Sequence, residues 1–286
     1  MAGQRRFTPD DVTKLSPENK LAIVGTRDPE GHPHLSLLTS LLALDEGHLA
    51  LGEFSEGISK RHMQDRPETG FLIMTLDGML WRGTARWTKK ATEGPEYRLF
   101  NDKPMFRYNS YFGIHTVHYL DLVSLDQVSP LPLAGVGAGM LSSLPLRIPG
   151  LVSGRAGKAQ SAARQHPPMN PWTRALFRGL GSLKFLGVID RDGFCRIIPV
   201  LQATSRGASH LVLAETPWHR ELAAIPDQTA VAVMGIRMNM ESVVVRGTYH
   251  RFSRFPPGFA RIDVNWVYNS MPPAHGVIYP PSEGCT

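Results

Sequence analysis

The stretch Leu21-Ala-Ile-Val-Gly-Thr-Arg-Asp28, an apolar run that enters the turn Asp28-Pro-Glu-Gly31, has a counterpart further along the chain. There, Lys184-Phe-Leu-Gly-Val-Ile-Asp190 enters the turn Arg191-Asp-Gly193, and the two turn glycines are 162 positions apart. Both runs are short and apolar and lead into Asp and Gly, which is typical of a strand that ends in a tight turn. Each run therefore predicts the first strand of a repeated unit.

The segments that follow these turns recur in the same order. After the first turn we expect an apolar strand from His34 to Leu42, and after the second a strand over 195–202. Leu49 and Leu211, in the next strand of each copy, are also 162 positions apart. A polar, helix-compatible stretch and another apolar strand come next, at 57–65 and 71–75 in the first copy and at 218–224 and 230–234 in the second. Both copies end on Arg-Gly-Thr, at 82–84 and 246–248, so the order and spacing together predict a tandem duplication.

Short strands separated by glycine turns, with one helix between the third and fourth strands, predict a mostly β fold. We expect each copy to be a small antiparallel β-barrel with flanking helices, because closing a sheet removes exposed strand edges. Helices are predicted to begin at Thr8-Pro9 and at Asn170-Pro171, where a capping residue precedes a proline. The predicted domains are residues 1–128 and 170–286, joined by a linker over 129–169.

The composition is that of a globular protein. Of 286 residues, 42% are hydrophobic and 20% charged, which excludes a disordered chain, a coiled coil and a collagen-like rod. The chain has two cysteines, Cys195 and Cys285, and a polar, basic start without an apolar run. These features predict a reduced, cytoplasmic protein without a disulfide framework.

The positive net charge comes from the middle of the chain. Residues 127–189 contain seven Lys and Arg and no Asp or Glu, and the basic residues are scattered among Pro, Gly and Ser. This pattern predicts a solvated basic linker rather than a nucleic-acid-binding module, with an anionic partner or a membrane surface as the alternative. The uncharged run 127–146 contains three prolines and is not expected to span a membrane.

Three motifs follow one another in the first copy. They are Asp28-Pro-Glu-Gly-His-Pro33 with Leu35-Ser-Leu-Leu-Thr39, then Gly57-Ile-Ser-Lys-Arg-His-Met-Gln-Asp-Arg-Pro67, then Trp81-Arg-Gly-Thr-Ala85. Their order resembles the pyridoxamine 5'-phosphate oxidase-like superfamily of FMN-binding split barrels. The resemblance covers residues 12–125 well and 172–255 more loosely. It implies two tandem split barrels, FMN as the cofactor and an oxidoreductase that acts on a small molecule.

The resemblance places the FMN phosphate on the loop that begins at Gly57. A helix N-terminus offers backbone N–H groups and the positive end of the helix dipole, and Ser59, Lys60 and Arg61 add a hydroxyl and two cations. The alternative for these three residues is an ordinary helix start with solvated charges.

The resemblance also implies residues for the flavin ring. It places the ring along the second strand, on the backbone of Leu37, Leu38, Thr39 and Ser40, and the hydroxyls of Ser36, Thr39 and Ser40 need partners if they are buried. Trp81 and Arg82 fall where the last core strand approaches the flavin. Core packing is the alternative for the leucines and for Trp81.

The second copy lacks the Gly57-Ile-Ser-Lys60 motif and has Thr216-Pro-Trp-His-Arg220 instead. We therefore expect a degenerate second barrel, so that one chain acts as its own pseudo-dimer; a homodimer of the chain is a further arrangement that the resemblance allows. The expected partners are a small-molecule substrate and NAD(P)H, without nucleic acid. No catalytic residue is assigned.

The alternative function is a non-catalytic flavin- or haem-binding protein for storage, sensing or electron transfer. The histidines to consider for haem are His32, His34, His115 and His118. No cysteine cluster or HExxH motif, which are typical of metal sites, accompanies them. Gly135-Val-Gly-Ala-Gly139 lacks the third glycine of a dinucleotide fingerprint.

Overall fold

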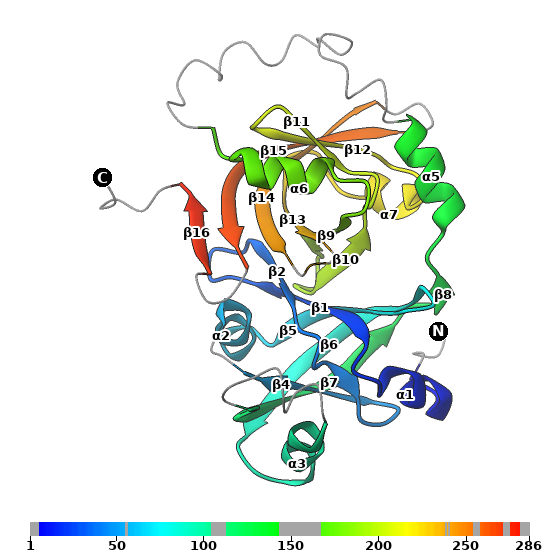
Figure 1. The fold of residues 1–286 in the computed structure, drawn as a ribbon, viewed down its shortest axis with the longest axis vertical. Coiled ribbons are helices and arrows are strands. Elements are labelled where there is room, and N and C mark those ends of the chain that lie inside the picture. Colours follow the sequence, from blue (N-terminus) through cyan, green and yellow to red (C-terminus); the bar gives the residue numbers. More distant parts are fainter. Residues whose placement is uncertain are drawn as a thin grey trace. The chain divides into compact units, whose positions relative to one another are not determined.

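The computed structural model describes residues 6–54, 57–103, 113–142, 167–237, 239, 241–253, 258–270 and 275–280. The chain divides into two compact units, residues 1–131 with 189–197 and residues 132–188 with 198–286. It contains two eight-stranded sheets, and all strand pairs within them are antiparallel where their register is defined (Figure 1). The mostly β fold predicted from the sequence is confirmed.

The first sheet has the strand order β2-β1-β5-β6-β7-β4-β3, and β8 pairs with β6. Three helices lie with it among the described residues, and we call this assembly the first barrel. Its strands are β1 (Lys20–Arg27), β2 (Pro33–Leu37), β3 (Leu42–Ala43), β4 (His48–Glu53), β5 (Glu68–Thr75), β6 (Met79–Ala91), β7 (Thr116–Leu125) and β8 (Ser129–Pro130). Its helices are α1 (Pro9–Leu15), α2 (Ile58–Asp65) and α3 (Pro95–Asp102).

The second sheet repeats that order as β10-β9-β13-β14-β15-β12-β11, with β16 paired to β15. With its helices we call it the second barrel. Its strands are β9 (Leu183–Ile189), β10 (Cys195–Pro199), β11 (Thr204–Arg206), β12 (His210–Ala214), β13 (Thr229–Ile236), β14 (Ser242–Ser253), β15 (Phe259–Asn269) and β16 (Gly276–Tyr279). Its helices are α5 (Leu133–Ser142), α6 (Pro171–Arg178) and α7 (His219–Ala223). The matching strand orders confirm the tandem duplication.

Each barrel has its own hydrophobic core. In the first, Phe7, which precedes the α1 cap, and Leu15 at the end of α1 join strand residues such as Ile73 and Trp81. In the second, Leu176 and Phe177 of α6 pack with residues such as Val233. Apolar side chains buried on this scale dominate the stability of a barrel.

Both predicted helix starts are confirmed. Thr8 caps α1 in a capping box, in which its hydroxyl accepts from Asp11 N and the Asp11 carboxylate accepts from Thr8 N. Asn170 caps α6 through its side-chain oxygen, which accepts from Thr173 N at 2.8 Å. A proline follows each cap at the first helical position, where its missing N–H costs nothing.

The continuous strands predicted over 34–42 and 195–202 are wrong, and both copies break at the same place. β2 ends at Leu37, and a turn closes where Leu41 N donates to Leu38 O at 3.0 Å. In the second copy Ala203 N donates to Val200 O at 2.8 Å. The backbone N–H and C=O groups of an apolar segment can form hydrogen bonds in a tight turn as well as in a strand. The hydrophobicity of these segments therefore did not indicate where the strand ends.

The repeated Arg-Gly-Thr motif has a structural cause in both barrels. A Cβ at Gly83 would overlap the carbonyl oxygen of Ser124 on β7, and one at Gly247 would overlap that of Asp263 on β15. Each glycine lies beside a β-bulge with that neighbouring strand. Only glycine lets the strands approach so closely.

A buried lysine predicts how the stability of the first barrel depends on pH. The ammonium of Lys20 donates to Pro17 O at 2.7 Å. Burial, aided by the charge of Lys103, lowers the pKa of Lys20 from 10.5 to about 8. Between those two pH values the unfolded chain binds more protons than the folded one, so stability rises with pH, by about 2 to 3 kcal/mol from this group.

Denaturant unfolding of wild type and Lys20→Met at a series of pH values tests this expectation. The variant lacks the titrating amine, so its stability should rise less than that of the wild type between about pH 8 and 10.5. Equal slopes in the two proteins would contradict the assignment to Lys20.

The predicted linker over 129–169 contains regular structure at its start. β8 pairs with β6, and α5 follows, while residues 143–166 lie outside the described part of the chain. The domain boundaries at 128 and 170 stay a prediction.

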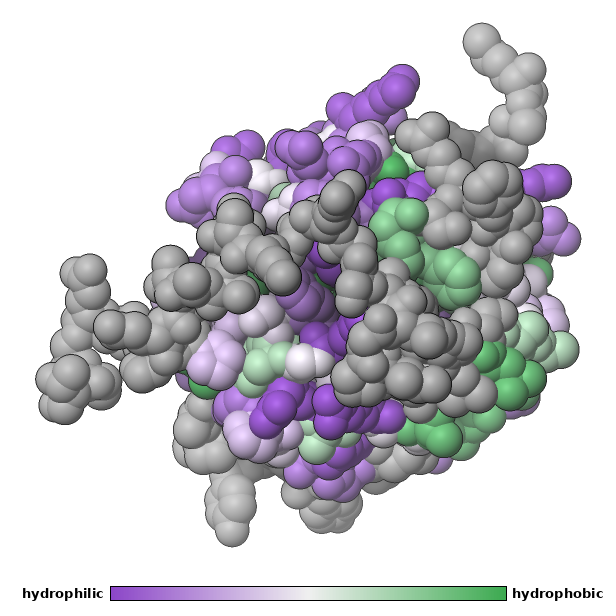
Figure 2. Space-filling view, turned by 90° about the horizontal axis from the view of Figure 1, so that it is seen from above, coloured by the Kyte–Doolittle hydropathy of each residue, from purple (hydrophilic) through white to green (hydrophobic). Residues whose placement is uncertain are grey.

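α5 is apolar and exposes Leu133 and Leu141, and Figure 2 shows green, hydrophobic residues gathered on the side of α5. Among the described residues, no helix has the length and apolarity needed to cross a membrane.

Candidate functional site

The first turn of α2 contains the residues predicted to hold a phosphate. Gly57 is its N-cap, in an extended conformation, and makes no side-chain cap because it has no side chain. The first N–H groups of a helix have no acceptor within the helix, so they favour an anion at this end. Ser59 and Lys60 are buried, whereas Arg61 is exposed.

Lys60 belongs to a buried chain of polar side chains from four elements. Its Nζ lies 3.6 Å from Oε1 of Glu53, at the end of β4. Oε2 of Glu53 lies 2.8 Å from Nε2 of His118 on β7, and the indole N–H of Trp87 on β6 donates to Nδ1 of His118 at 3.1 Å. Lys60 and Glu53 are 5% and 6% exposed, and His118 is fully buried.

The Trp87 contact decides the tautomer of His118. Because an indole N–H can only donate, Nδ1 of His118 must accept, and the ring proton lies on Nε2 and is donated to Glu53. Both ring nitrogens are thus used within the protein, so neither offers a lone pair to a haem iron.

Glu53 is held as an anion. Burial alone would raise its pKa, but the hydrogen bond from His118 and the positive charge of Lys60 outweigh burial and leave the pKa below its ordinary value. The opposite charges of Lys60 and Glu53 therefore form an ion pair inside the first barrel.

The predicted ring-binding segment is a strand end followed by a turn. Ser36 and Leu37 end β2, and Leu38 and Thr39 follow, all partly exposed. Ser40 is buried, and its hydroxyl donates to Gly52 O at 2.7 Å. The Ser40 hydroxyl therefore has a structural partner.

Trp81 and Arg82 occupy adjacent positions on β6 but have different surroundings. Trp81, 1% exposed, lies in the core of the first barrel, and its indole N–H donates to Asp11 Oδ1 on α1 at 2.8 Å. Arg82 Nη2 lies 3.6 Å from Asp126 Oδ2. The polar end of Trp81 is thus occupied by the residue that also completes the α1 capping box.

The second barrel buries a glutamate at the position that matches Glu53. Glu215 lies 162 residues later, directly after β12, and is fully buried. Arg251 on β14 contacts both its oxygens, Nε at 2.6 Å from Oε1 and Nη2 at 2.8 Å from Oε2, and His219 Nδ1 lies 2.9 Å from Oε2. Sequence reasoning missed both glutamates, although the same 162-residue offset connects them.

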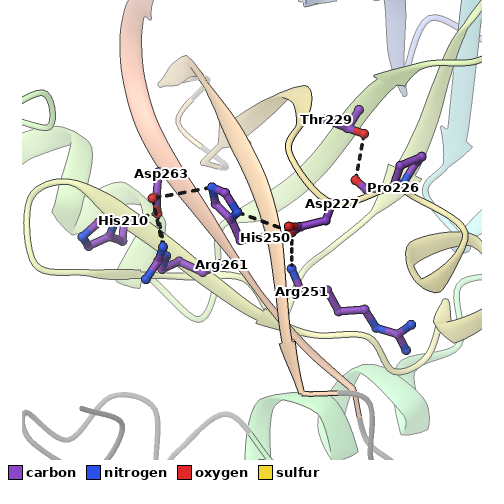
Figure 3. Close-up of polar contacts among 8 residues, drawn as sticks. All are labelled: His210, Pro226, Asp227, Thr229, His250, Arg251, Arg261 and Asp263. Atoms are coloured by element: carbon purple, nitrogen blue, oxygen red, sulfur yellow. Dashed lines mark hydrogen bonds and ion pairs between the residues drawn. The ribbon is translucent and has the colours of Figure 1, made fainter. Parts of the chain in front are cut away.

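A row of ionisable side chains lies beside the backbone of Arg251 in the second barrel. The backbone N–H of Arg251 donates to Asp227, and His250 lies between Asp227 and Asp263, while the Arg251 side chain extends away from them (Figure 3). Burial would raise the pKa of Asp263, but the hydrogen bond from His210 and the charge of Arg261 outweigh it and lower that pKa. The row therefore pairs its charges internally.

The other histidines considered for haem are scattered. His32 and His115 are exposed, and buried His34 packs edge-on against His62, with 5.7 Å between ring centres. Among the described residues, one group could hold a metal ion, Asp28, Glu30 and His32, in which Asp28 also accepts the backbone N–H of His32 at 2.7 Å to close the β1–β2 turn.

A groove of about 720 Å³ lies on the first barrel apart from the predicted site residues. It is lined by Tyr119, Leu120 and Asp121 of β7 and by Glu96 of α3, among others. The Tyr119 hydroxyl donates to Glu96 at 2.9 Å, and burial together with Glu96 raises the pKa of Tyr119 to about 12. None of the ten predicted site residues lines this groove.

No family model matches the chain, and no curated protein matches it. Solved structures do. An FMN-binding protein from Syntrophomonas wolfei is 12% identical with a TM-score of 0.35, and the match covers 43% of this chain and 86% of that protein. A candidate pyridoxamine 5'-phosphate oxidase from Lactobacillus delbrueckii is 17% identical with a TM-score of 0.34, covering 44% and 98%. A FAD-binding protein from Mesorhizobium loti is 15% identical with a TM-score of 0.29, covering 43% and 94%.

Each match spans less than half of this chain but most of the other protein. Within this chain, the same order of strands occurs twice. The two halves of the chain therefore share one antiparallel strand order, in two tandem copies.

Proposed function

We propose that the first barrel binds FMN and that the chain is a flavin-dependent oxidoreductase acting on a small molecule, with NAD(P)H as the electron donor. The observation that carries the proposal is the buried ammonium of Lys60 at the first turn of α2, beside a glycine N-cap. A buried cation and helix N–H groups together suit a phosphate monoester.

The chain's own residues would divide the work. Ser59 and Lys60 would hold the phosphate from within the fold, and exposed Arg61 would approach it from solvent. The segment Ser36 to Ser40 and Arg82 stay the proposed contacts of the ring, whereas Trp81 lies in the core and supports the strand. The bound flavin would supply the hydride or electron chemistry.

The second barrel supports a single site per chain. Its helix α7 has only five residues and begins after Trp218, without the Gly-Ile-Ser-Lys motif. Its buried Glu215 is paired with Arg251 on both oxygens. We therefore propose one flavin for each chain.

FMN titration of the wild type and two variants, followed by flavin fluorescence, tests the phosphate site. We expect Ser59→Ala with Lys60→Ala to weaken FMN binding at least about tenfold, because a charge-assisted contact and a hydroxyl donor are lost. Arg220→Ala changes an exposed residue of α7 in the second barrel and should leave the affinity unchanged. Equal losses in the two variants would contradict the assignment to the first barrel.

Anaerobic addition of NAD(P)H to the FMN-loaded chain separates an enzyme from a passive binder. An oxidoreductase that uses this donor should bleach the oxidised flavin absorbance. A protein that only stores or senses flavin should keep it.

A further inference from the structure

We infer that Glu53 is an internal anion that Lys60 exchanges for the phosphate of an incoming ligand. The inference rests on the proposed phosphate site and adds how that site is gated. In the chain without ligand the Glu53 carboxylate is the counterion of Lys60, and a bound phosphate monoester takes over that place.

The two contacts of Glu53 differ in length. Its Oε2 lies 2.8 Å from His118 Nε2, the length of a strong hydrogen bond, whereas its Oε1 lies 3.6 Å from Lys60 Nζ, a long ion pair. The two contacts use different oxygens. Lys60 can therefore turn from Glu53 while the contact with His118 stays intact.

His118 is fixed in the role of donor to Glu53. The indole N–H of Trp87 occupies its Nδ1, so its proton stays on Nε2 and faces the carboxylate. Glu53 thus keeps one charge-assisted hydrogen bond in both states of Lys60, and this bond offsets part of the cost of a buried carboxylate without its ion pair.

Lys60 already lies close to the start of α2. A Cβ placed on Gly57 would be 3.8 Å from its Nζ, so the ammonium lies beside the N-cap backbone. A small rotation of the long Lys60 side chain brings the ammonium to an anion at that helix end.

The second barrel provides the contrast within the same chain. Arg251 contacts both oxygens of Glu215 at 2.6 and 2.8 Å, and His219 adds a third contact at 2.9 Å. A planar guanidinium that binds both oxygens of a carboxylate is held more firmly than an ammonium with one long contact. The second barrel has kept the buried glutamate but not the exchangeable cation.

The exchange predicts an unusual response to Glu53→Gln. Without the carboxylate, Lys60 loses its ion pair with Glu53 in the free protein, and a bound phosphate supplies a new one. The variant should be less stable than wild type when free, yet bind FMN more tightly, because repulsion between Glu53 and the phosphate is gone.

The experiment compares wild type, Glu53→Gln and the matched control Glu215→Gln in the full chain. Dissociation constants for FMN and for riboflavin, which lacks the phosphate, are measured by fluorescence. We expect Glu53→Gln to tighten FMN binding about tenfold and to leave riboflavin binding unchanged. Glu215→Gln should change neither affinity. Unchanged or weaker FMN binding by folded Glu53→Gln would overturn the inference.

A second pair of variants covers the case in which Glu53→Gln does not fold. Lys60→Met and the double variant Glu53→Gln with Lys60→Met both lack the Lys60 ammonium. The double variant should bind FMN more tightly than Lys60→Met, because only the single variant places a carboxylate near the phosphate; equal affinities would overturn the inference. A wild-type chain that binds neither FMN nor inorganic phosphate would instead remove the proposed function.

Discussion

Replacing Arg251 by methionine is expected to lower the free energy of unfolding of the second barrel by about 3 to 5 kcal/mol. Glu215 is fully buried, and Arg251 contacts both its oxygens. Methionine fills similar space but removes the guanidinium from the carboxylate, while the contact of Glu215 with His219 Nδ1 at 2.9 Å remains. The loss is measured by urea unfolding followed by tryptophan fluorescence.

Two controls separate the ion pair from a general loss of arginine. Arg220→Met, on the exposed face of α7, should cost less than about 0.5 kcal/mol. The double variant Glu215→Gln with Arg251→Met removes the buried charge together with its partner, so it should be more stable than Arg251→Met alone. A double variant as unstable as the sum of its single variants would contradict the pairing.

Gly83→Ala and Gly247→Ala should each destabilise their own barrel by upwards of about 3 kcal/mol. In both cases the new Cβ overlaps a backbone carbonyl oxygen of the neighbouring strand, Ser124 or Asp263. Backbone in the middle of a sheet moves only by breaking ladder hydrogen bonds. Thermal unfolding of the two variants measures the cost.

Gly137→Ala is the matched control, because a Cβ there has open space within α5. Alanine favours a helix by about 1 kcal/mol over glycine, so this variant should be neutral or slightly more stable. Unfolding temperatures of Gly83→Ala and Gly247→Ala equal to that of wild type would show that the motif is not required for strand packing and would leave a ligand as its cause.

The duplication could be predicted from the sequence because the two copies share turn glycines and helix-capping residues at matching positions. Gly31 and Gly193 occupy matching positions in the two copies. Both have positive φ values, 90° and 88°, which glycine adopts at little cost. Thr8 and Asn170 cap their helices as predicted. These signals are local, so they can be interpreted without the fold.

The partners of the candidate site residues could not be predicted because they come from distant strands. Lys60 contacts Glu53 on β4, and Glu53 in turn contacts His118, which is 65 positions away on β7. The Trp81 indole binds Asp11 on α1, 70 positions away. Nothing in the spacing of these residues indicates that the barrel brings them together; only the 162-residue offset between Glu53 and Glu215 marked the glutamates.

The most direct test of a single flavin site in the first barrel is the amount of flavin bound per chain after reconstitution with FMN and removal of the excess. The absorbance of the purified protein and of the flavin released on denaturation gives the ratio. The account predicts one flavin per chain in wild type and in Arg220→Ala, and a strong loss in Ser59→Ala with Lys60→Ala. Two flavins per chain, or full occupancy in that double variant, would contradict a single site at the first turn of α2.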